Sequence, residues 1–134
     1  MSFHHVAWRF APGEDLRRSL ESKLAGEAYT AGWVCAAVGS LNEATLRFAA
    51  HHAASSLAGP LELISLSGTF SPDGIHLHAS VADGAGRMSG GHLDYGCVVR
   101  TTAELVCVLC TGELSFRREL DERTGYKELV VGRP

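Results

Sequence analysis

Residues 61–93, LELISLSGTFSPDGIHLHASVADGAGRMSGGHL, contain the pattern that decides the fold. Three β-rich segments follow one another here, at 61–70, 75–82 and 87–93. The turns between them, Ser71-Pro72-Asp73-Gly74 and Asp83-Gly84-Ala85-Gly86, carry the residue types that favour tight reversals of the chain. Consecutive strands joined by such short turns pair antiparallel, because a parallel connection needs a long crossover.

The segments before this stretch predict one strand and one helix. Residues 3–10 alternate loosely between apolar and polar and end at Ala11-Pro12-Gly13, which is typical of a strand followed by a turn. Residues 14–25 change period, with leucines every fourth residue at Leu16, Leu20 and Leu24. That spacing predicts an amphipathic helix.

The rest of the chain predicts more strands. We expect residues 51–59 to be irregular or to form a short helical turn. The expected strands outside the central stretch are 32–39, 44–49, 97–110, 114–120 and 126–131. Few strands are separated by helices, so the sequence predicts an α+β fold: a mostly antiparallel sheet of seven to eight strands with one main helix near the N-terminus.

Length and charge limit what the protein can be. The 134 residues are near the commonest size of one domain, so we expect residues 1–134 to fold as a single domain. The formal net charge is -3, and basic residues are interleaved with acidic ones, which argues against sequence-independent DNA binding. We also expect no membrane segment and no secretory signal, and therefore a cytoplasmic protein with reduced thiols.

The segment Ile75-His76-Leu77-His78-Ala79 carries the clearest chemical signal. Residues two apart on a strand point to the same face, so His76 and His78 project together while their neighbours point the other way. Two adjacent imidazoles supply half of a tetrahedral zinc shell without distortion of the backbone. The ordinary alternative is an incidental pair of surface histidines.

His92 is the candidate third ligand, and its position depends on the turn. If Gly84-Ala85-Gly86 is a three-residue loop, His78 faces His92 and the three rings converge. A four-residue loop would pair Leu77 with His92 and send that ring to the other face, unless a bulge at Gly90-Gly91 restores it. Three protein ligands would leave one coordination position open, as catalytic zinc sites do.

Glu62 is the candidate catalytic carboxylate. Strand parity places it with Ile64, Leu66 and Gly68. An acid among aliphatic neighbours is either a surface residue at a strand start or a partly desolvated group with a raised pKa. In the second case Glu62 would act as a general base or would support a metal ligand.

Two other patterns favour structural explanations. Cys107 and Cys110 have CxxC spacing, but no second pair completes a four-cysteine zinc site, and on a strand their side chains diverge. Two buried small hydrophobic residues explain them better. The glycines of 84–91 resemble a nucleotide-binding loop, which requires a helix where this sequence predicts a strand.

The chain resembles the plant and prokaryote conserved (PPC) domain over nearly its whole length. Matching segments are Arg9-Phe10-Ala11-Pro12-Gly13-Glu14-Asp15-Leu16, Ala37-Val38-Gly39-Ser40-Leu41, Leu61 to Thr69, His76-Leu77-His78-Ala79-Ser80, Gly90-Gly91-His92-Leu93, Gly96 to Glu104 and Thr124 to Leu129. The resemblance implies a compact α+β subunit that assembles into a homotrimer. The fold is similar to that of acetolactate decarboxylase, a zinc lyase that holds its metal with an HxH pair and a further histidine.

By matching positions, that similarity implies His76, His78 and His92 as ligands of zinc or another divalent metal. The other catalytic residues of the decarboxylase do not align clearly, so its reaction is not carried over. The resemblance also points toward DNA, because plant members join this domain to AT-hooks and prokaryotic relatives are often described as DNA-binding.

Two functional hypotheses follow. The first is a homotrimer with a three-histidine zinc site that binds or transforms a small molecule, as a lyase or hydrolase if it is an enzyme, with Glu62 as proton carrier. The second is a DNA-associated or protein-binding regulatory module in which the histidine cluster is structural or vestigial.

Overall fold

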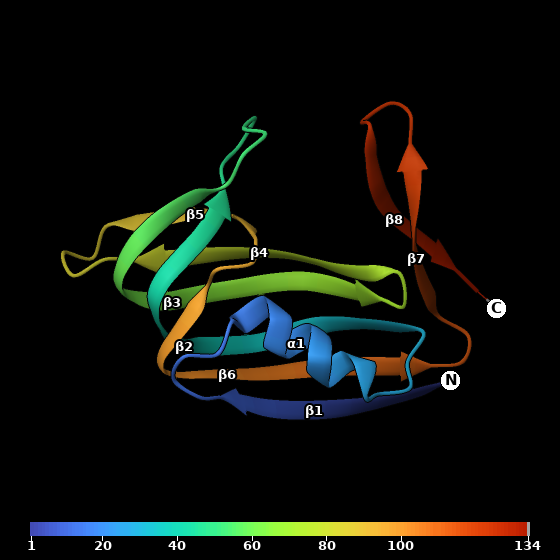
Figure 1. The fold of residues 1–134 in the computed structure, drawn as a ribbon. Helices are drawn as coiled ribbons and strands as arrows, with labels where there is room; N and C mark the ends of the chain where they lie inside the picture. The colour runs from blue at the N-terminus through green and yellow to red at the C-terminus, as the bar shows by residue number, and fades with distance from the viewer. Residues whose placement is uncertain (134) are drawn as a thin grey trace.

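The computed structural model describes residues 1–133, and within them the chain forms one helix and eight strands (Figure 1). The elements are β1 (Ser2–Phe10), α1 (Leu16–Ala25), β2 (Ala31–Arg47), β3 (Ser55–Ser71), β4 (Gly74–Ala82), β5 (Met88–Leu93), β6 (Val98–Thr111), β7 (Ser115–Asp121) and β8 (Tyr126–Gly132). The α+β class, the antiparallel sheet and the position of the helix agree with the prediction from the sequence.

The main sheet has six strands in the order β1-β6-β2-β3-β4-β5, and all its pairings are antiparallel. β5 also pairs with the end of β2, through Leu46 opposite Leu93 and Arg47 opposite His92. Strands β2, β3, β4 and β5 therefore close into a ring. β7 and β8 form a separate hairpin that projects away from the sheet (Figure 1).

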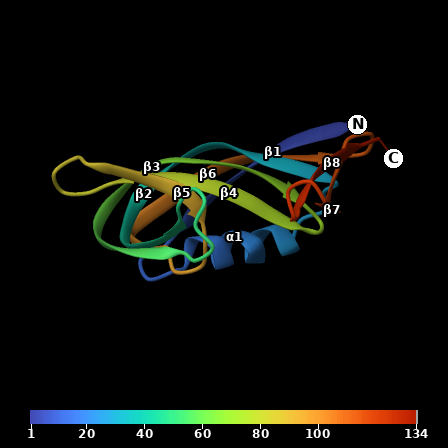
Figure 2. The ribbon, with the colours of Figure 1, turned by 90° about the horizontal axis from the view of Figure 1, so that it is seen from above.

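Helix α1 covers one face of the sheet, as the view from above shows (Figure 2). Leu16, Leu20 and Leu24 are at most 2% exposed and form the apolar stripe that the four-residue spacing predicted. The helix begins two residues after the expected Glu14 because Asp15 is its N-cap, accepting a 3.0 Å hydrogen bond from the Arg18 backbone N–H. The same carboxylate accepts 2.7 Å from the Gly96 N–H, which ties the helix start to the loop before β6.

β2 corrects one expectation about the strands. We expected two strands, at 32–39 and 44–49, and the structure has one strand of 17 residues. Its register against β6 shifts between Gly39 and Leu41 and again between Leu41 and Glu43, so the polar step in the sequence is an irregularity within a strand. The buried Ser40 hydroxyl lies 2.7 Å from Thr101 Oγ1 on β6, which satisfies both hydroxyls there.

β3 corrects a second expectation. It begins at Ser55, so the irregular segment expected at 51–59 is wrong in its second half. Ser55 to Ala58 pair with β2 beyond the bulge that follows Leu41. Pairing with a long bent neighbour therefore overrides the weak local preference of these small residues.

The cysteines behave as their spacing predicted. Cys107 and Cys110 are fully buried with free thiols, and burial raises the pKa of Cys107 to about 12. In the part of the chain that the structure describes, no helix has the length and apolar character to cross a bilayer.

Candidate metal centre

The β4–β5 hairpin sets the positions of the three histidines. Asp83 donates its backbone N–H to Arg87 O at 2.9 Å, and Gly86 adopts a positive φ of 77° that a glycine takes without strain. The loop is therefore the three-residue alternative, and His78 lies directly opposite His92. His76 and His78 share one face of β4, while Leu77 is buried on the other.

The three rings converge closely. His76 Nε2 lies 3.2 Å from His78 Nε2, and the ring centroids of the three pairs lie 4.9, 5.2 and 5.7 Å apart. One nitrogen from each ring can be chosen so that all three lie within 4.8 Å of one another. Tetrahedral zinc with bonds of about 2.0–2.1 Å places its nitrogen ligands about 3.4 Å apart. One pair already has that separation, and small rotations of His92 would bring the third nitrogen in.

His76 and His92 are held in the protonation state that binds metal. Burial lowers the pKa of His92 to about 4, assisted by the positive charge that His76, Arg47 and Arg17 would present to it. Burial also lowers the pKa of His76, with further lowering by His78 and Arg118. These two imidazoles are therefore neutral near pH 7, and a neutral imidazole has the lone pair that a metal ligand needs.

One atom of the cluster lacks a partner within the described chain. His92 Nδ1 is buried and has no hydrogen bond. An unsatisfied buried polar group costs about 1–3 kcal/mol, so native structures usually supply a partner. Together with three converging imidazole nitrogens, this atom shows that the residues present fit a divalent metal such as zinc.

Arg17 of α1 supports the strands that carry two of the histidines. Its guanidinium donates to Leu93 O at 3.0 Å and to Ile75 O at 3.3 Å, and it pairs with Glu21 at 3.1 Å. Leu93 follows His92 and Ile75 precedes His76, so one side chain anchors the backbone beside both rings. Its side chain is only 15% exposed, which makes these bonds less screened than those of a surface arginine.

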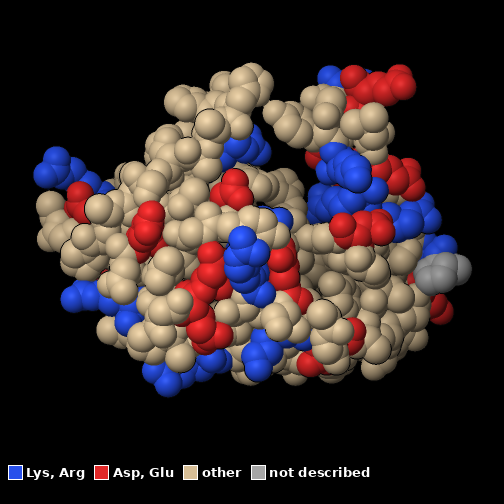
Figure 3. All heavy atoms as spheres, in the orientation of Figure 1, with Lys and Arg blue, Asp and Glu red and all other residues tan. Residues whose placement is uncertain are grey.

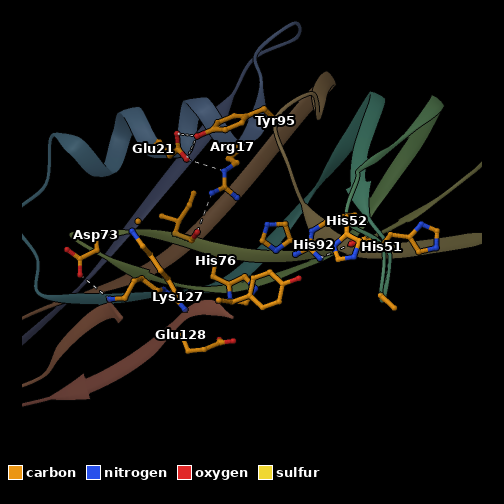
Figure 4. Close-up of a pocket in the computed structure, with 16 residues that line it drawn as sticks. Arg17, Glu21, His51, His52, Asp73, His76, His92, Tyr95, Lys127 and Glu128 are labelled. Atoms are coloured by element: carbon orange, nitrogen blue, oxygen red, sulfur yellow. Dashed lines mark hydrogen bonds and ion pairs between the residues drawn. The ribbon is translucent and has the colours of Figure 1, made fainter. Parts of the chain in front are cut away.

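Two histidines of the cluster, His76 and His92, lie at the floor of a cavity of about 740 Å³ (Figure 4). His78 is exposed and is not part of the lining. One wall comes from the end of β2 and the β2–β3 loop, with Arg47, His51 and His52. The opposite wall comes from the β7–β8 hairpin, and α1 together with Tyr95 closes a third side. Such a volume is within the roughly 300–1,000 Å³ of ordinary small-molecule sites.

Sequence reasoning missed the residues of the hairpin wall. Arg118 of β7 donates through Nη2 to Thr69 Oγ1 at 2.6 Å, and Thr69 is the β3 partner of His76. The Arg118 N–H also donates to Asp73 Oδ2 at 3.0 Å. Glu128 of β8 lines the same cavity, and its charge acts on His76 by opposing the lowering of that pKa. No spacing rule connects residues this far apart in the sequence, so no sequence signal predicted them.

Glu62, the candidate carboxylate from the sequence, is not brought to the cluster. The register of β3 against β4 shifts between Leu63 and Ser65, so the expected parity with Leu66 and Gly68 is wrong. Glu62 is exposed and lies opposite Ala82, whereas His78 lies opposite Ser67 five residues along β3. It is not part of the cavity lining.

The fold and the site define a class of α+β protein with three converging histidines on a strand hairpin, two of which line a cavity. The chain belongs to the family of the Plants and Prokaryotes Conserved (PCC) domain, whose sequence profile matches residues 1–111. This is the family that the sequence motifs indicated. The β7–β8 hairpin follows the matched region.

Two relatives are longer proteins. The bifunctional protein GlmU of one Synechococcus strain is 47% identical over 123 residues, which cover 92% of this chain and 20% of that protein. The GlmU of a second Synechococcus strain is 46% identical over 123 residues and covers 92% of this chain. The chain thus spans about a fifth of the length of these relatives.

Solved structures share the fold over most of both chains. A hypothetical protein from Salmonella enterica is 38% identical, with a TM-score of 0.93 and coverage of 98% of this chain and 95% of that one. A metal-containing protein from Archaeoglobus fulgidus is 25% identical, with a TM-score of 0.80 and coverage of 95% and 93%. A Bacteroides thetaiotaomicron protein whose name proposes DNA binding is 18% identical, with a TM-score of 0.82 and coverage of 96% of each chain, a likeness of fold alone.

Proposed function

We propose that this chain is a homotrimeric PCC-domain protein in which His76, His78 and His92 bind zinc or another divalent metal, and that the cavity above them binds or transforms a small molecule. The observation that carries the proposal is the placement of three ring nitrogens within 4.8 Å of one another, with His76 and His92 at the floor of a 740 Å³ cavity. The metal-containing relative from Archaeoglobus fulgidus supports it. When bound by three protein ligands, zinc keeps a further position for water or substrate and polarises a carbonyl oxygen.

For proton transfer we propose Glu128 in preference to Glu62. Glu128 is half-buried and lines the cavity, and its charge acts on His76. A general base must lie within hydrogen-bonding reach of its substrate or of a bridging water. Glu62 is exposed outside the cavity lining, so its catalytic role stays a prediction from the sequence alone.

Assembly into a trimer is supported by the uncovered face of the sheet. Phe3, Val38, Ile64 and Val106 are 51%, 56%, 49% and 37% exposed, and the directly opposed pairs of β1, β6 and β2 put three of them on the face away from α1. Contiguous exposed apolar surface is typical of an interface between subunits.

We further propose that residues 1–134 act as one domain, since the hairpin beyond the family match completes the cavity wall. We also propose that the protein is cytoplasmic, because its four free thiols suit a reducing compartment.

Metal analysis tests the central claim. We expect untagged protein to contain about one zinc or other divalent ion per chain after reconstitution, and His76→Ala to contain none. His52→Ala is the matched control, because His52 lines the cavity outside the cluster and should leave the metal in place. Absence of metal from the wild-type protein would end the metal-site proposal. Light scattering on the same samples tests the trimer, and a monomer would refute that part.

The second candidate is a DNA-associated regulatory protein with a structural histidine cluster. Its support is the name of the Bacteroides thetaiotaomicron protein that shares the fold. The net charge of -3 opposes it, because phosphate binding requires clustered cations. We expect no gel shift of duplex DNA at low salt. A shift that disappears as salt rises would favour this candidate instead.

A further inference from the structure

The cavity above the histidines has basic side chains on two opposite sides. Figure 3 shows Lys and Arg on either side of the hollow between the β2–β3 connection and the β7–β8 hairpin. The basic residues of the lining are Arg17, Arg47, Arg118 and Lys127. A concave, partly desolvated site lined with like charges concentrates ions of the opposite sign. The positive charge available to a ligand depends on which of these side chains already have acidic partners within the protein.

Arg47 is positioned by strand register and has no acidic partner. It lies directly opposite His92 in the β2–β5 pair, and opposed residues of an antiparallel pair share a face. Its guanidinium donates one hydrogen bond, from Nη1 to His51 O at 3.3 Å, and lies 5.9 Å from the centre of the Tyr126 ring. No ion pair involves it within residues 1–133. Most of its donors therefore remain available.

Arg118, on β7, lines the wall of the cavity opposite Arg47. Its guanidinium makes one hydrogen bond within residues 1–133, to Thr69, and no ion pair. Its Nε is buried without a partner. Its Nη1 group makes no hydrogen bond within residues 1–133, so Arg118, fixed at Nη2 and lining the cavity, can donate a charge-assisted hydrogen bond to an oxyanion.

The acidic residues of the lining set the charge of the expected ligand. Glu21 is engaged by Arg17 at 3.1 Å and by the Tyr95 hydroxyl at 2.9 Å, and Asp73 accepts from the Arg118 N–H. Glu128 accepts from Thr124 Oγ1 at 3.0 Å and keeps its charge near the floor. With Arg17 paired to Glu21, three cations of the lining, Arg47, Arg118 and Lys127, stand against the two carboxylates of Asp73 and Glu128, and this excess of one positive charge favours a monoanion over a highly charged ligand. The cavity volume also exceeds what an inorganic ion alone would fill.

We propose that the cavity binds a small organic monoanion, a carboxylate, which Arg118 and Arg47 hold from opposite sides above the histidine cluster. Only one part of this proposal rests on the proposed metal site: a second oxygen of the ligand would be directed toward the metal. The contacts of the carboxylate with the two arginines do not require the metal. This assigns a substrate class to the site and gives the β7–β8 hairpin a role in selecting it.

Calorimetric titration with lactate tests the proposal on the whole chain, with and without bound zinc. Lactamide is the matched neutral probe, because it replaces the carboxylate with an amide of the same shape. Inorganic phosphate tests the other common oxyanion. We expect saturable binding of lactate, and no binding of lactamide. Binding of phosphate without lactate, or equal binding of lactate and lactamide, would overturn the carboxylate assignment.

Two variants connect the binding to the residue. Arg118→Gln should weaken lactate binding about tenfold, the order expected from the loss of a charge-assisted hydrogen-bonding pair. Arg117→Gln is the control, since Arg117 is 55% exposed, pairs with Glu119 and does not line the cavity. Metal content and thermal unfolding of both variants are measured alongside. Unchanged lactate affinity in a folded Arg118→Gln protein would refute the role of this residue and, with it, the inference.

Failure of the inference and failure of the metal site give different results. Protein that binds zinc but no lactate refutes the carboxylate site and leaves the metal proposal intact. Protein that binds no zinc but binds lactate in an Arg118-dependent manner refutes the metal proposal and retains the anion site. Absence of both zinc and lactate binding refutes both.

Discussion

The β4–β5 hairpin and the β7–β8 hairpin contribute to one cavity in different ways. The first supplies the floor, where His78 lies opposite His92 through a pairing fixed by a three-residue loop. The second supplies a wall, and Arg118 reaches Thr69 of β3 from 49 residues away along the chain. The floor depends on local register, whereas the wall depends on tertiary packing. Metal binding and ligand selection should therefore respond to different substitutions.

The largest effect is expected from a substitution that separates the strands of the floor. A Cβ at Gly68 would lie 2.1 Å from the His76 carbonyl oxygen, a contact that backbone atoms cannot relieve without moving. We expect Gly68→Ala to lower the free energy of unfolding by about 3 kcal/mol and to reduce bound metal strongly. Gly84→Ala is the control, because no atom lies within 4 Å of its added Cβ. Urea denaturation and metal analysis measure both, and a stable, fully metallated Gly68→Ala protein would contradict the strand positions.

The sequence predicted the floor because its geometry follows from two short-range rules. The alternation along β4 placed His76 and His78 on one face, and the glycine-rich loop offered a register that brought His92 opposite. The choice between a three- and a four-residue loop stayed open, because it depends on how Gly86 adopts a positive φ. The helix was equally accessible, since Leu16, Leu20 and Leu24 repeat at the helical period.

The wall and the carboxylate could not be predicted in that way. A strict two-residue period predicts that Glu62 shares a face with Leu66, but the register shift after Leu63 breaks that period. Arg118 and Glu128 lie in an ordinary mixed-charge segment, and only the packing of the second sheet on the first brings them to the cavity. Ser40-Leu41-Asn42 resembled a break between strands because a bulge and a turn have similar composition.

The next effect in size concerns the link between helix and floor. Arg17→Gln removes the donors that hold the carbonyls of Ile75 and Leu93 beside two of the histidines. Loss of such supporting bonds typically lowers metal affinity by about 10–100-fold, so we expect about tenfold here with the fold retained. Arg18→Gln is the control, since Arg18 is exposed and stacks on Tyr95. Competition with a metal-sensitive chelating dye gives both affinities, and equal values would show that Arg17 does not support the site.

A smaller and more selective effect should distinguish wall from floor. Thr69→Val removes the hydroxyl that accepts from Arg118 Nη2 and keeps the shape of the side chain. A hydrogen bond to a charged group contributes about 1.5–3 kcal/mol, and part of this is recovered because the freed guanidinium can bind water. We therefore expect weaker lactate binding by several-fold and unchanged metal content. Loss of metal in this variant would mean that Arg118 and Thr69 belong to the floor as much as to the wall.

The smallest predicted effect is the pH dependence of the metal-free floor. His92 has a pKa of about 4 in the folded chain because it is buried, whereas in the unfolded chain it would take up a proton near the ordinary histidine value of 6.5. Between these values the unfolded state binds more protons, so stability is greatest above about pH 6.5 and falls as the pH drops toward 4. The lowered pKa of His76 acts in the same direction.

In chelator-treated protein, thermal unfolding at pH 5 should therefore occur a few degrees below that at pH 7.5. Because acidic groups contribute to the same trend, the test is the difference between proteins: His92→Gln should flatten the profile and the exposed His5→Gln should not, and parallel profiles would show that His92 is not desolvated in the folded state.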